Sequence, residues 1–107
     1  MKLQFSAGGV IFKGKEVLLC QHSQHHGWVF PKGLIGDKEE NESKEVTAVR
    51  EVKEETGVDA KIIKILKPVT YWFVFSRKAG SRGAGEKEKV RKTVYYFLME
   101  YIGGDIG

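Results

Sequence analysis

The chain of 107 residues contains one cysteine, two prolines and no long apolar run. A single thiol cannot form an internal disulfide, so the composition gives no indication of an oxidising compartment. No apolar segment approaches the ~20 residues needed to cross a bilayer, and the first residues lack the apolar region of a secretion signal. We therefore expect a cytoplasmic protein with no membrane partner, in which Cys20 is a small core residue.

Length and a hydrophobic content of 41% predict one domain spanning residues 1–107. Segments with the alternation and the β-branched and aromatic content of strands lie on both sides of a single helical segment. Pro31-Lys32-Gly33 is expected to begin a loop that leads toward that helix. The expected strands are 3–13, 16–22, 28–30, 60–66, 69–76 and 90–101.

The helical segment is punctuated at both ends. Ser43 is a predicted N-cap and Gly57 a predicted C-terminal stop, which bounds a helix of roughly thirteen residues, a common length. Ala48, Val49 and Val52 follow helical spacing and form a narrow stripe that can be buried. The acidic side chains of this helix are consequently expected to face outward.

Three of these acids, Glu51, Glu54 and Glu55, occur within little more than one helical turn. Side chains three and four apart share a helix face, so the carboxylates would raise one another's proton affinity unless a positive charge lay among them. The last two also oppose the helix dipole. A solvated acidic face with Lys44 and Lys53 interspersed is the ordinary alternative. We interpret the crowding as a site for a divalent cation.

Nine positions of residues 36–58 have a fixed spacing: Gly, five residues, Glu, seven residues, then Arg-Glu-aliphatic-x-Glu-Glu-x-Gly-aliphatic. This spacing resembles the signature of the Nudix hydrolase family. The resemblance implies an α/β/α sandwich with a mixed sheet, and hydrolysis of a nucleoside diphosphate linked to another group with Mg²⁺ or Mn²⁺. The matching residues are Gly36, Glu42, Arg50, Glu51, Val52, Glu54, Glu55, Gly57 and Val58.

By the same resemblance, Glu54 and Glu55 would be metal ligands, and Glu51 would be a metal ligand, the base that accepts the proton of water, or both in different metal occupancies. Arg50 would orient the glutamates through its planar guanidinium. Glu42 would hold the loop ahead of the helix. A main-chain carbonyl would join the metal site, either that of Lys32 or that of Ile35, and the former is preferred. An additional late acidic ligand would be Glu86, Glu88 or Glu100, or absent.

Segments 5–10, 28–33, 71–73 and 92–99 look most like the bis(5′-nucleosyl)-tetraphosphatase branch, the diadenosine tetraphosphate hydrolases. This likeness implies a dinucleoside polyphosphate substrate. Tyr71 or Tyr96 would stack on adenine, although core packing is the alternative for each aromatic, and Lys32 and Lys92 would bind phosphates. Rival hypotheses are cleanup of oxidised nucleoside triphosphates, removal of pyrophosphate from RNA 5′ ends, and a nucleotide-binding module that has lost catalysis.

Residues 77–92 hold seven cations against two acids, although the whole chain has a net charge of only +4. A basic segment beside an acidic metal site suits a phosphate-rich substrate, whereas basic loops are often merely solvated. The three histidines in the polar stretch 21–27 are expected at the surface rather than on a metal.

Family members usually continue past the last strand found here with another strand and a helix. The chain therefore looks C-terminally short, and one sheet face is expected to lack its covering helix. The return strand is apolar on both faces, so we expect self-association or segment exchange.

Overall fold

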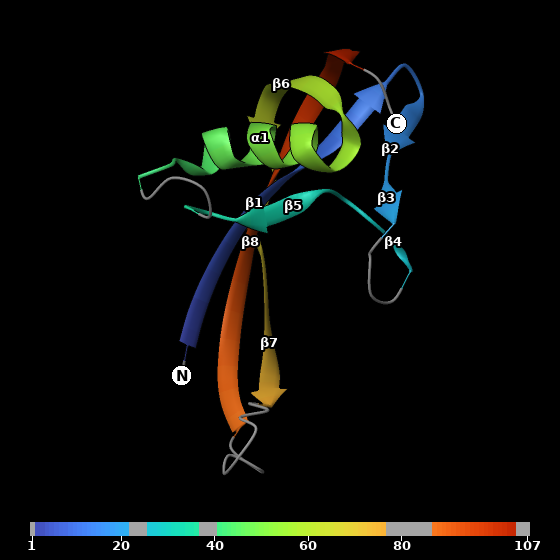
Figure 1. Cartoon of the computed structure of the whole chain (residues 1–107). Coiled ribbons are helices and arrows are strands. Elements are labelled where there is room, and N and C mark those ends of the chain that lie inside the picture. The colour runs from blue at the N-terminus through green and yellow to red at the C-terminus, as the bar shows by residue number, and fades with distance from the viewer. Residues whose placement is uncertain (1, 22–25, 37–40, 77–86, 105–107) are drawn as a thin grey trace.

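The computed structural model of the chain describes residues 2–21, 26–36, 41–76 and 87–104. Two long strands, β1 (Lys2–Lys13) and β8 (Lys87–Gly104), run parallel to each other at the centre of a six-stranded sheet. Their pairing extends from Lys2 opposite Val90 to Phe12 opposite Glu100. Figure 1 shows that this central pair continues well beyond the part of the sheet on which the helix lies.

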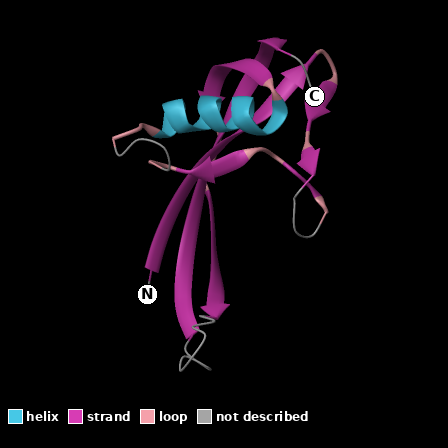
Figure 2. Ribbon diagram, viewed as in Figure 1, coloured by secondary structure: helices cyan, strands magenta, loops and turns pink. Residues whose placement is uncertain are grey.

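The remaining strands of this sheet are antiparallel to one of the two central strands. β2 (Glu16–Leu18) and β5 (Lys32–Leu34) pair with β1, and β6 (Val58–Ile65) and β7 (Val69–Ser76) pair with β8. A separate two-stranded sheet consists of β3 (Cys20–Gln21) and β4 (Trp28–Val29). The mixed sheet with a helix on it is an α/β fold, as the sequence predicts (Figure 2).

Helix α1 (Lys44–Thr56) has the thirteen residues expected from its end signals. Ser43 is the N-cap, and its hydroxyl accepts a hydrogen bond from the Val46 N–H at 3.1 Å. Gly57 ends the helix in the left-handed conformation, with φ of 78°, and its N–H bonds the Lys53 carbonyl. Both predicted helix boundaries are confirmed.

The core lies between α1 and the sheet. Ala48 and Val52 are fully buried and belong to one cluster with sheet residues, and Val49 packs against its edge, as the stripe predicts. Burial of this stripe fixes which helix face is turned away from the sheet. The sheet residues of the cluster are Ala7, Ile11, Val58, Ala60, Phe97 and Met99.

Three expectations from the sequence are wrong. The strand expected at 16–22 is interrupted at Leu19, so its end forms the short strand β3. The loop expected at Pro31-Lys32-Gly33 is largely strand β5, because pairing with β1 overrides the local preference of Pro and Gly for turns. Cys20 is only partly buried and lies outside the core cluster.

The tip of the β7–β8 hairpin, Glu86, and the histidine positions 22 and 25 lie outside the described residues, whereas His26 is exposed. No helix among the described residues has the length and apolarity needed to span a membrane.

Candidate metal and substrate site

Arg50 joins three of the predicted site carboxylates from the middle of α1. Its Nε and Nη2 donate to the two oxygens of Glu42, each at 2.7 Å, in a bidentate pair. Its Nη1 donates to Glu51 at 3.1 Å and to both oxygens of Glu54 at 3.1 and 3.2 Å. The contacts expected of an orienting arginine are therefore present in this structure.

Glu42 anchors the segment that enters the helix. Besides Arg50, it accepts a hydrogen bond from the Thr47 hydroxyl at 2.8 Å. Hydrogen bonding from Arg50, assisted by Thr47 and by the backbone of Gly36, lowers the pKa of Glu42 to about 2. This carboxylate consequently stays ionised over the physiological pH range and supports the guanidinium from the side opposite the box glutamates.

Glu51 departs from the expectation that all three acids face outward, because the residue is only 6% exposed. Strand β5 covers it: a Cβ added at Gly33 would collide with the Glu51 carboxyl group. The missing side chain of Gly33 thus leaves the space that the carboxylate occupies. Glu54 and Glu55, one turn further on, are exposed as predicted.

Glu55 connects the helix to β5 by accepting a hydrogen bond from the backbone N–H of Lys32 at 3.0 Å. Partial burial of the Glu55 carboxyl and then the charge of Glu51 raise its pKa, and Glu54 adds to the effect, whereas the Lys32 N–H opposes it. The two neighbouring acids therefore act on Glu55 in the direction that their spacing predicts.

The β1–β5 register determines where the peptide groups of β5 point. Gly9 donates its N–H to the Pro31 carbonyl, and Ile35 donates to the Phe5 carbonyl. Residues of an antiparallel pair alternate between facing the partner strand and facing away from it. The N–H and C=O of Lys32 therefore point away from β1, toward Glu55, whereas Ile35 belongs to the set that faces β1.

Within the described residues, no three Asp, Glu, His or Cys side chains are placed for joint coordination of a metal ion. Arg50 holds two of the box carboxylates, and the third is directed to the Lys32 amide. The donors nevertheless suit a hard cation, because carboxylate and carbonyl oxygens are the ligands that Mg²⁺ and Mn²⁺ prefer.

The four predicted substrate-binding residues share one face of the sheet, because Lys32 pairs with Gly8, Gly8 with Tyr96, and Tyr71 with Lys92. Burial, followed by the charge of Lys32, lowers the Lys92 pKa. Tyr71 lies directly opposite Lys92 in the β7–β8 pair. Burial, followed by the proximity of Tyr71, raises the pKa of Tyr96. Two cations and two phenols therefore form one surface.

Phe30 belongs to this surface and was not anticipated from the sequence. Its ring meets that of Tyr96 edge to face, with centroids 6.0 Å apart. The signal that could have found it is its place in segment 28–33, which carries the likeness to the tetraphosphatase branch. The late acids Glu88 and Glu100 lie toward opposite ends of β8, where they pair with Phe75 and Lys61, so neither acid is placed with the box carboxylates by these pairings.

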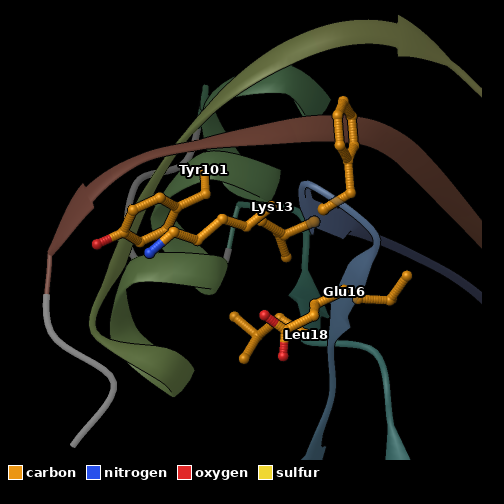
Figure 3. Close-up of a pocket in the computed structure, with 7 residues that line it drawn as sticks. Lys13, Glu16, Leu18 and Tyr101 are labelled. Carbon is orange, nitrogen blue, oxygen red and sulfur yellow. The ribbon is translucent and has the colours of Figure 1, made fainter.

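A small cavity of about 150 Å³ lies elsewhere, at the β1–β2 hairpin (Figure 3). Lys13 extends along the Tyr101 ring, with its Nζ 4.5 Å from the ring centroid. The lining residues Ile11, Phe12, Lys13, Glu16, Val17, Leu18 and Tyr101 include none of the predicted site residues. This cavity is thus separate from the carboxylate site.

Comparison with known proteins finds similarity to this chain in both sequence and fold. The NUDIX domain family model matches residues 2–106. The MutT4 protein of Mycobacterium tuberculosis is 38% identical over 111 residues, covering 94% of this chain and 40% of the relative. An RNA pyrophosphohydrolase of Bartonella henselae is 35% identical over 105 residues, covering 94% of this chain and 58% of the relative.

Among solved structures, the Ap4A hydrolase of C. elegans superposes with a TM-score of 0.65 at 25% identity, covering 98% of this chain and 75% of that one. The family-model match over residues 2–106 shows that the chain belongs to the Nudix family. It spans between two fifths and three fifths of the length of the two relatives matched by sequence.

Proposed function

We propose that this chain hydrolyses a phosphoanhydride bond in a nucleoside diphosphate linked to another group, with a dinucleoside polyphosphate such as diadenosine tetraphosphate as its substrate. One observation carries the proposal: Lys32 touches both halves of the site. Its backbone N–H donates to Glu55, and the charge of its side chain acts on Lys92, where it contributes to lowering the pKa of that amine. A polyphosphate bound by the two lysines would therefore lie beside the box glutamates.

The proposed metal ligands are Glu51, Glu54 and Glu55, with the carbonyl of Lys32. The peptide orientation in β5 favours this carbonyl over that of Ile35, because only the former faces away from β1. The chemistry supplied by Mg²⁺ or Mn²⁺, once bound, is neutralisation of charge on the phosphate oxygens and activation of water.

The side chains of this chain would perform the remaining tasks. Glu51, held by Arg50 and shielded by β5, would accept a proton from the attacking water. Lys32 and Lys92 would bind phosphate oxygens, and Tyr71 and Tyr96 would stack on a base. Phe30 would hold the Tyr96 ring in place.

Removal of pyrophosphate from RNA 5′ ends is the second candidate, favoured by the names of relatives. Besides the Bartonella protein, an NAD-capped RNA hydrolase of Pectobacterium carotovorum is 32% identical over 96 residues, covering 90% of this chain and 30% of the relative. The same carboxylate chemistry would serve either substrate, and also an oxidised nucleoside triphosphate. A cytoplasmic location remains a prediction for all three.

A substrate screen with products identified by mass tests these proposals. Diadenosine tetraphosphate, 8-oxo-dGTP and triphosphorylated RNA would be compared with and without Mg²⁺. We expect the fastest turnover on the dinucleotide. Glu54→Gln should abolish Mg²⁺-dependent turnover while the fold persists, and Glu45→Gln, in the exposed first turn of the same helix, should not. Absence of turnover on every substrate would instead favour a nucleotide-binding module.

A further inference from the structure

The hairpin of β7 and β8 carries an exposed aromatic and cationic surface beyond the end of α1, hereafter the ribbon face. Residues directly opposite in antiparallel strands share a sheet face. Trp72 lies opposite Arg91, and Val74 lies opposite Lys89. The ribbon face is defined by these four residues together with Lys87 and Leu3, which lies beside Arg91 in the β1–β8 pair.

The apolar members of this face are strongly exposed. Trp72 is 50% exposed, Val74 60% and Leu3 52%. A large ring that is half open to water costs hydrophobic free energy, so its exposure on a regular strand indicates a surface available to a partner. None of these residues belongs to the proposed catalytic or substrate-binding set.

The charges of the ribbon face have one sign. Lys87, Lys89 and Arg91 alternate along β8 and therefore point to the same side of the sheet. Glu88, the acid between them, has the opposite parity and points to the other side. The Lys89 Nζ lies 4.9 Å from the centroid of the Trp72 ring, and the Arg91 Cζ lies 5.8 Å from it.

We propose that the ribbon face binds single-stranded nucleic acid, with a base stacked on Trp72 and the neighbouring phosphates on Lys89, Arg91 and Lys87. An aromatic ring beside cations that follow a strand is the arrangement that binds unpaired bases and backbone together, whereas lysine, present twice on this face, is depleted at protein interfaces. Figure 1 shows that β7 and the neighbouring part of β8 extend away from α1, so the helix does not cover them.

A second copy of this chain suits the surface less well. A two-fold dimer would bring the same patch of each subunit together, so the three cations of one ribbon face would lie against the three of the other. None of the six residues that define this face is acidic, so their repulsion would not be neutralised. A nucleic acid supplies the opposite charge in a regular array and releases counterions on binding.

The test uses a fluorescein-labelled 5′-hydroxyl oligouridylate of about twelve nucleotides, within the site sizes of single-strand binders. The probe has no phosphoanhydride bond, and Mg²⁺ is omitted, so the result does not depend on the proposed hydrolysis. Anisotropy should rise on titration with the whole chain and fall with salt. Trp72→Ala should weaken binding roughly 5- to 150-fold, whereas Trp72→Phe should keep most of it.

Lys89→Ala and Arg91→Ala should each lower the slope of log affinity against log salt by about one. Lys61→Ala and Lys64→Ala, which remove exposed cations from β6, are the matched controls and should leave affinity unchanged. Circular dichroism and the Tm of each variant separate misfolding from loss of contact. The proposal is overturned if the Trp72→Ala, Lys89→Ala and control variants bind alike, or if the oligonucleotide does not bind at all.

Two further measurements address the other occupants. Equal affinity for a duplex of the same length would remove the stacking role of Trp72. Dimers that light scattering detects and that Trp72→Ala dissociates would show that the surface is a protein interface, and the proposal would fail. Displacement of the oligonucleotide by an acidic polyglutamate peptide of matched charge would have the same meaning. An oligodeoxythymidylate arm distinguishes RNA from DNA.

Discussion

The backbone N–H of Lys32 donates a 3.0 Å hydrogen bond to the Glu55 carboxylate, and this contact links strand β5 to the last turn of α1. The two residues are 23 positions apart in the sequence. The helix dipole disfavours a carboxylate at a helix C-terminus, where no free N–H group of the helix is available to it. The N–H of Lys32 in β5 supplies the hydrogen bond that stabilises Glu55 there.

Gly33→Ala tests whether β5 must approach Glu51 this closely. The added Cβ would collide with the carboxyl group, so β5 or Glu51 has to shift. We expect kcat/KM to fall roughly 100-fold, as displacement of a catalytic group by about 1 Å does, with little change in circular dichroism. Gly103→Ala is the matched control, because a Cβ there meets nothing within 4 Å. Equal activity of the two variants would contradict the assigned role of Glu51.

Glu42→Gln is expected to lower the Tm at neutral pH by removing the anion that Arg50 holds. The folded-state pKa of about 2 is below the ordinary value of 4.5, so the folded state favours the ionised form. This stabilisation is complete above pH 4.5 and is lost as the pH falls toward 2. The Tm difference between wild type and variant should therefore shrink between these two pH values.

The measurement is thermal unfolding by circular dichroism at pH 7, 4 and 3. Glu45→Gln is the comparison, because Glu45 is exposed and its nearest recorded cation, Lys44, is 3.8 Å away. A Tm difference for Glu42→Gln that stays constant across the range would show that Arg50 does not depend on that charge.

Lys92→Ala should raise KM for diadenosine tetraphosphate more than it lowers kcat, because the amine would bind phosphate in both ground and transition states. An increase of roughly tenfold corresponds to the loss of one charge-assisted hydrogen bond. Steady-state kinetics at fixed Mg²⁺ provide the measurement. Lys64→Ala removes an exposed cation of β6 and should leave KM unchanged. A fall in kcat with no change in KM for Lys92→Ala would show that Lys92 does not bind the substrate.

Gly57→Ala should destabilise the fold by about 1–2 kcal/mol, because an L side chain is disfavoured at a φ of 78°. Gly57→Asn should cost less, since Asn tolerates this conformation better than Ala does. Urea unfolding measures both free energies. If the two variants are equally stable, backbone conformation is not what selects glycine at this helix end.

The helix and its buried stripe could be predicted from the sequence because their signals are local. Ser43, Gly57 and the stripe at Ala48 and Val52 lie within the segment they describe, and the structure places them as expected. The burial of Glu51 could not be predicted, because it depends on strand β5, whose local sequence is typical of a loop. Pro31 and Gly33 suggest a turn, and only their pairing with β1 reveals otherwise.

The substrate side was predicted by family likeness rather than by spacing, and the structure brings those four residues together. The missed member, Phe30, contacts Tyr96 across 66 positions of sequence, a separation at which periodicity carries no information. Self-association through an uncovered sheet face stays a prediction. The exposed ribbon face carries charge of one sign. The sequence analysis considered this basic segment as a loop, whereas Lys87, Lys89 and Arg91 lie on strand β8.

Lys32 contacts Glu55 through its main chain and not through its side chain, so the two parts of this residue can be considered separately. The amide that Glu55 accepts from is present in every residue except proline, so replacement of the side chain leaves that anchor intact. If Lys32 binds phosphate as proposed, a different side chain at this position would alter phosphate binding and keep the hydrogen bond to the acidic turn of α1. Under the proposed roles, selectivity and reactivity would then evolve separately at one residue.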